Sequence, residues 1–81
     1  MKYLTIESFV NSMNEEDLWK IIEDYENWKE TGEDENSLLR NKAREFCSNL
    51  TLPLRYHSDW MPKIAMGAYR HFALKYKQME K

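Results

Sequence analysis

The chain has 81 residues with two glycines and two prolines, and 32% of its residues are charged. This length allows one domain, and the scarcity of turn residues excludes a β-rich fold and favours long helices. A single cysteine excludes an internal disulfide, and no signal-peptide or membrane-spanning pattern is seen, so we expect a cytoplasmic protein.

Acidic and basic residues are segregated along the chain. Residues 1–36 contain eleven acids and three bases, a net charge of −8, whereas residues 37–81 contain nine bases and three acids, a net charge of +6. Segregation on this scale predicts electrostatic attraction of a partner, or attraction between the two halves on folding.

The first two predicted helices cover residues 5–13 and 15–31. Thr5 and Asn14 are the expected N-caps, because their side-chain oxygens can accept a bond from a free backbone N–H, and Gly32 is expected to end the second helix. Apolar residues recur at helical spacing in both segments, at Ile6, Phe9, Val10 and Met13, and then at Leu18, Ile21, Ile22, Tyr25 and Trp28.

The third predicted helix covers residues 36–50, with Asp34 or Asn36 as its cap. Pro53 ends the helical pattern, because the residue before a proline avoids helical geometry. Residues 51–56 are therefore expected to form an extended connector, held to the core by Leu52 and Leu54. The apolar face of this helix consists of Leu39, Ala43, Phe46, Cys47 and Leu50.

The fourth predicted helix covers residues 59–79, with Ser58 or Asp59 as its cap and Pro62 in its first turn. Its apolar arc is wider than a one-sided surface helix needs. Either this helix is central and contacted by the other three, or part of the arc is an exposed contact patch, formed by Met66, Tyr69, Ala73 and Tyr76. We expect an all-α single domain (1–81), a compact bundle of about four helices with the last helix central.

The leading functional hypothesis is a non-enzymatic protein that binds another protein. Trp19 and Trp28 are expected on opposite flanks of the second helix, among carboxylates that suit a basic partner surface. A core-edge role for both indoles is the simpler alternative. The residues assigned to protein binding are Trp19, Glu23, Glu26, Trp28, Met66, Tyr69 and Tyr76.

The second hypothesis is a nucleic-acid-binding accessory protein that uses the basic C-terminal half. Its contact residues would be Arg55, Lys63, Arg70, Lys75 and Lys77. The sequence pI of about 5.7 argues against it, since these cations also balance the acidic half. Self-association into a homodimer through the apolar arc of the last helix is a third hypothesis.

No catalytic, metal or cofactor signature is found, and we expect no enzyme. His57, Asp59, His71 and Cys47 lack the close spacing of structural zinc ligands, and neither glycine belongs to a phosphate-binding loop. Membrane attachment through the last helix is disfavoured, because the same apolar surface is needed for the core.

In length, in its Lys-, Asn-, Glu- and Tyr-rich composition and in the lack of an enzyme motif, the chain resembles the small early or accessory proteins of bacteriophages. The resemblance is one of overall style and covers no particular residues. It implies an inhibitor or modulator that binds and redirects one host protein.

Overall fold

The computed structural model describes residues 2–79, which contain four α-helices, one short 3₁₀ helix and no strand. The molecule measures 44 × 32 × 17 Å. The all-α fold of four helices predicted from the sequence is confirmed. The elements in chain order are α1 (Ile6–Asn11), α2 (Glu15–Thr31), α3 (Leu38–Asn49), η1 (Leu54–Tyr56) and α4 (His57–Met79).

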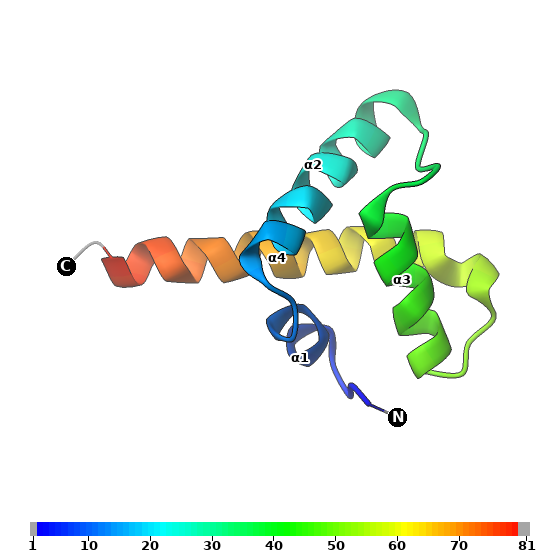
Figure 1. The fold of residues 1–81 in the computed structure, drawn as a ribbon, viewed down its shortest axis with the longest axis horizontal. Coiled ribbons are helices and arrows are strands. Elements are labelled where there is room, and N and C mark those ends of the chain that lie inside the picture. Colours follow the sequence, from blue (N-terminus) through cyan, green and yellow to red (C-terminus); the bar gives the residue numbers. More distant parts are fainter. Residues whose placement is uncertain (1, 80–81) are drawn as a thin grey trace.

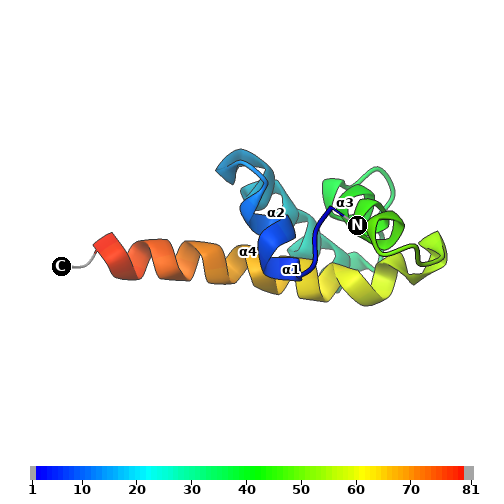
Figure 2. The ribbon, with the colours of Figure 1, turned by 90° about the horizontal axis from the view of Figure 1, so that it is seen from below.

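Helix α4 runs along the whole molecule, and the other three helices all pack against it (Figure 1). Figure 2 shows α2 and α3 on one side of α4, with the opposite side bare, and Figure 1 shows α1 below α4, across from α2. The prediction that the last helix is central is therefore confirmed, and one part of its wide apolar arc packs against the three neighbouring helices, while Met66, Ala73 and Tyr76 remain exposed. The α4 residues buried in these contacts are Met61, Ile64, Ala65, Ala68 and Phe72.

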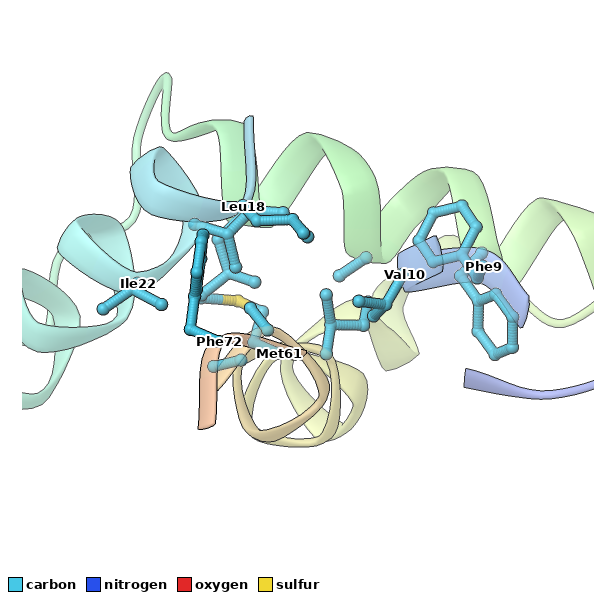
Figure 3. Packing of buried hydrophobic residues seen from close by; sticks show 13 residues of the cluster. Phe9, Val10, Leu18, Ile22, Met61 and Phe72 are labelled. Carbon is cyan, nitrogen blue, oxygen red and sulfur yellow. The ribbon is translucent and has the colours of Figure 1, made fainter. Parts of the chain in front are cut away.

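The core is one continuous cluster of side chains from all four helices (Figure 3). Phe46 of α3 packs against two other rings, with its ring centroid 5.0 Å from that of Phe9 and 5.1 Å from that of Trp60. Ring pairs at this distance stabilise a core beyond the area that they bury. The buried members from α1, α2 and α3 are Phe9, Val10, Leu18, Ile21, Ile22, Leu39, Ala43 and Phe46.

Gly67 allows α1 to approach α4 closely. A Cβ atom at this position would lie 2.8 Å from Cγ2 of Val10 and 3.2 Å from Cγ2 of Ile6. Non-bonded carbon atoms prefer separations of about 3.5–4.0 Å, so a side chain here would push α1 away. The glycine thus has a packing role in the middle of a helix, where its own helix propensity is low.

The predicted N-caps of α1 and α2 and the predicted end of α2 are confirmed, whereas α1 ends at Asn11, before the expected residue 13. The Thr5 hydroxyl accepts a bond from the backbone N–H of Ser8, and the Asn14 side chain accepts one from the backbone N–H of Asp17. Gly32 ends α2 with φ 76° and donates its N–H to the carbonyl of Trp28. These contacts satisfy backbone groups that have no partner within the helix.

The start of α3 differs from the prediction. Ser37 caps this helix, in place of Asp34 or Asn36, by accepting a bond from the backbone N–H of Arg40. Asn36 instead takes a left-handed conformation with φ 60°, which makes the chain turn immediately before the cap.

The connector between α3 and α4 also differs from the prediction. Residues Leu54–Tyr56 form the 3₁₀ helix η1, and Leu54 is 42% exposed where we expected it to hold an extended segment to the core. Because η1 leads directly into α4, this helix begins at His57, before the predicted caps Ser58 and Asp59. Pro62 consequently lies inside α4 and not in its first turn.

Candidate protein-binding surface

The outward side of α2 carries acids around one exposed indole. Glu16, Trp19, Glu23 and Glu26 follow one another at spacings of three, four and three residues, which places them on one side of the helix. The Trp19 side chain is 46% exposed, and its ring stacks on that of Phe72 from α4, with the centroids 4.4 Å apart. We call Glu16, Trp19, Glu23 and Glu26 the acidic aromatic face.

A shallow depression between α2 and the start of α3 adjoins the acidic aromatic face. Among its lining residues Lys20 is the only cation, and the carboxylate of Asp24 holds the Lys20 ammonium at 2.6 Å. A basic group that enters the depression therefore meets a surplus of carboxylates. The lining residues are Glu16, Asp17, Trp19, Lys20, Glu23 and Leu38.

Helix α4 supports one end of the acidic aromatic face through Tyr69. Its hydroxyl donates a hydrogen bond to the carboxylate of Glu26. This bond lowers the pKa of Glu26 and, together with burial, raises the pKa of Tyr69 to about 12. Because the bond favours the charged carboxylate, Glu26 is a fixed negative charge at neutral pH.

The structure separates the remaining residues that were assigned to protein binding. Trp28 lies on the other flank of α2, where it is half-buried, packs against the core and contacts Tyr25 with the ring centroids 6.1 Å apart. Met66 and Tyr76 lie on α4 and are 61% and 53% exposed. The structure therefore brings Trp19, Glu23, Glu26 and Tyr69 together and places Trp28 elsewhere.

The residues of the nucleic-acid hypothesis do not form one surface. Lys63, Arg70 and Lys77 are exposed and recur every seven residues, which puts them in a line along α4. We call these three residues the α4 row. Lys75 lies away from it and is bound to α2, and Arg55 lies on η1 with its guanidinium 4.9 Å from the ring centroid of Tyr56.

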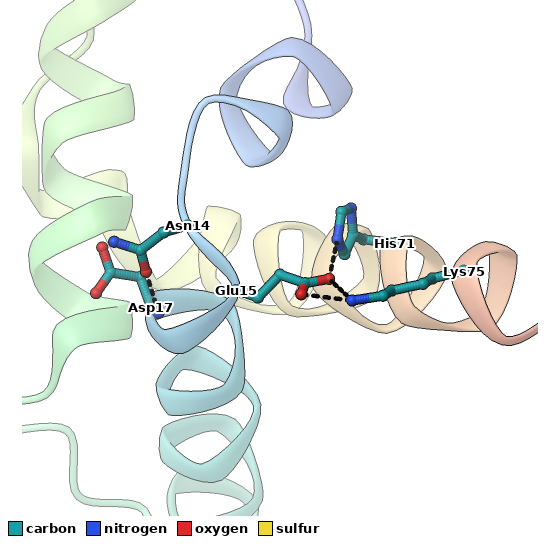
Figure 4. A network of polar contacts seen from close by, with 5 residues as sticks. All are labelled: Asn14, Glu15, Asp17, His71 and Lys75. Atoms are coloured by element: carbon teal, nitrogen blue, oxygen red, sulfur yellow. Dashed lines mark hydrogen bonds and ion pairs between the residues drawn. The ribbon is translucent and has the colours of Figure 1, made fainter.

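Glu15 links the acidic and basic halves of the chain (Figure 4). The Nζ atom of Lys75 lies 2.6 Å and 2.8 Å from its carboxylate oxygens, and Nε2 of His71 lies 3.1 Å from one of them. A second contact joins the halves where Nε2 of His57 lies 3.3 Å from the carboxylate of Asp34. The two halves thus attract each other at these points, while Glu16 and Glu23 remain exposed.

The Glu15 contacts predict a specific pH response. The hydrogen bonds from Lys75 and then His71 lower the pKa of Glu15 below its ordinary value of 4.5. The contacts of ionised Glu15 therefore contribute their full stabilisation at pH values above 4.5. This stabilisation is lost as the pH falls through the lower pKa that Glu15 has in the folded protein. We expect Lys75→Met to raise the pKa of Glu15, measured from carboxyl chemical shifts during an NMR titration.

Lys77→Met is the matched control for this titration, because Lys77 is an exposed lysine of the same helix that belongs to the α4 row. This variant should leave the pKa of Glu15 unchanged. An equal pKa of Glu15 in the wild type and in Lys75→Met would contradict the observed contact.

Two features of the surface were missed by the sequence reasoning. Phe72 was not assigned to the surface, yet its ring supports the indole of Trp19. Glu15 was not expected to contact α4, yet its carboxylate forms an ion pair with Lys75 of that helix. Both contacts join residues more than 50 positions apart, and no local spacing indicates such a pair.

Comparison of the chain with protein-family models, with curated proteins and with solved structures finds no match in any of the three. Within residues 2–79, no helix is both long and apolar enough to cross a membrane. The same residues contain no cluster of three side chains suited to holding a metal ion.

Proposed function

We propose that this chain is a non-enzymatic cytoplasmic protein, an inhibitor or modulator, whose acidic aromatic face binds a basic surface on another protein. The observation that carries the proposal is the half-exposed indole of Trp19, which is stacked on Phe72 and stands among carboxylates. An indole in such surroundings resembles the aromatic anchors that dominate many protein interfaces.

The two components of the face have different roles. The carboxylates of Glu16, Glu23 and Glu26 attract a basic surface from a distance and orient it, an effect that salt weakens. The indole of Trp19 supplies apolar area once contact is made, and its stacking on Phe72 limits the freedom that it loses on binding. The proposed affinity therefore combines a salt-dependent and a salt-independent part.

Trp19→Ala and Glu23→Lys are expected to weaken partner binding by different amounts. Removal of the indole should weaken it at least about thirtyfold, as expected for a central aromatic anchor worth about 2 kcal/mol or more. Reversal of the Glu23 charge should weaken binding mainly at low salt, because it acts through long-range attraction. The measurement is affinity capture from host extract with identification by mass spectrometry, followed by titration of the partner that is found.

Trp19→Phe is the control for folding, since it keeps an aromatic ring over Phe72 and should retain part of the affinity. Circular dichroism would verify that all variants are helical. Wild-type affinity in both Trp19→Ala and Glu23→Lys would refute the proposed binding face.

A further inference from the structure

One stripe of α4 carries apolar residues at the spacing of a coiled-coil seam. Met66, Tyr69, Ala73 and Tyr76 alternate in steps of three and four residues. Met66, Ala73 and Tyr76 are exposed, and Tyr69 is half-buried where it reaches α2. We call these four residues the α4 seam.

The α4 seam has opposite charges on its two flanks. On one flank lies the α4 row of Lys63, Arg70 and Lys77, none of which forms an ion pair within residues 2–79. On the other flank lies α2, as the bond from Tyr69 to Glu26 shows, with Glu23 exposed one turn earlier. The surface is therefore apolar along its middle, basic on one edge and acidic on the other.

We propose that a second copy of this chain docks on the α4 seam, with the two α4 helices parallel. A two-fold axis between parallel helices places the α4 row of each copy against the acidic flank of the other. An antiparallel pair would instead place Arg70 beside Arg70 of the other copy. The inference goes beyond the proposed function, because it assigns the α4 seam and the α4 row to contact with a second copy of the chain.

The end of α4 supports this choice of occupant. Beyond Phe72, the side chains of residues 73–78 are all exposed, and the helix projects past α1, α2 and α3 (Figures 1 and 2). The ion pair of Lys75 with Glu15 ties this segment to α2, but its apolar side chains remain in water, and a short helical segment with so little tertiary packing is marginal. In a parallel pair the projecting end of α4 in one copy packs against the same end of α4 in the other copy. The small side chain of Ala73 allows the two helices to approach closely there.

Arg70→Glu and Glu23→Arg each test the charge pairing without removing a buried group. Sedimentation of the purified protein over a range of concentrations should show a dimer, which each single variant weakens about tenfold or more at low salt. The double variant restores attraction with the charges exchanged and should recover most of the lost affinity. Arg55→Glu and Glu35→Arg are exposed controls away from the seam and should leave the dimer unchanged.

Several other results would contradict the parallel dimer. If Arg70→Glu tightens the dimer, the antiparallel arrangement holds and the proposal is wrong. If the double variant fails to restore the dimer, or neither single reversal weakens it, the charge pairing is absent. If the protein is a monomer at all concentrations but captures another protein through Trp19, the dimer is refuted and the proposed function stands. If it is a monomer and captures no other protein through Trp19, both the dimer and the proposed function are refuted.

Discussion

Met61→Ala is expected to lower the free energy of unfolding by about 2–5 kcal/mol. Met61 is fully buried on α4, at the centre of the cluster that α4 shares with its neighbours (Figure 3). Its truncation removes apolar area from the core and leaves a cavity that the surrounding helices can only partly fill. A chain of this length has a total stability of about 4–12 kcal/mol, so the loss is a large share of it.

The measurement is urea unfolding followed by circular dichroism at low protein concentration, where self-association does not contribute. Met66→Ala is the matched control, because it makes the same truncation on the same helix at a residue on the bare side. It should change the stability by less than about 0.5 kcal/mol. Equal losses in the two variants would show that α4 is not buried as described.

Asp24→Ala is expected to cost roughly 2–4 kcal/mol and to loosen the start of α3. Asp24 is the one charged residue of the described chain that is buried, at 8% exposure. One carboxylate oxygen accepts bonds from the backbone N–H groups of Leu38 and Leu39, and the other binds the ammonium of Lys20. Alanine would leave both N–H groups without this acceptor, and the N–H group of Leu39 is buried.

Amide hydrogen exchange distinguishes this local effect from a general loss of stability. In Asp24→Ala the amides of Leu38 and Leu39 should exchange faster, relative to the core amides, than in the wild type. Asp24→Asn keeps one acceptor oxygen and should lose less stability, and Glu23→Ala, its exposed neighbour, should lose less than about 0.5 kcal/mol. Unchanged exchange at Leu38 and Leu39 in Asp24→Ala would contradict the capping role.

Local chemistry made much of the helical layout predictable. The side chains of Thr5 and Asn14 each satisfy a free N–H three residues ahead, and Gly32 adopts the left-handed conformation that ends a helix. The wide apolar arc of the last helix correctly indicated a central position, although Met66, Ala73 and Tyr76 of that arc remain exposed. These features depend on a few neighbouring residues, so the sequence alone contains them.

The start of α3 was not predictable in the same way. Residues 34, 36 and 37 all belong to types that cap helices, so local preference cannot choose among them. In the structure Ser37 accepts the bond from the backbone N–H of Arg40, and Asp24 of the separate helix α2 accepts those from Leu38 and Leu39. Such a contact depends on how α2 and α3 pack, which no helical spacing encodes.

The candidate surface was predictable only in outline. Charge segregation and the two flanking indoles pointed to α2, and the structure does place Trp19 and Trp28 on opposite flanks. Periodicity could not show that Phe72 would support the first indole, or that the second would pack against the core. These outcomes depend on the crossing of α2 over α4, which brings distant residues together.

Amide hydrogen exchange of the complex tests most directly whether α2 and α4 form the contact surface, whether the partner is another protein or a second copy. The exchange of residues 15–31 and 66–79 should slow on association, while that of α1 and α3 stays as in the free monomer. Slowing confined to α1, α3 or η1, with α2 and the end of α4 unchanged, would contradict the account.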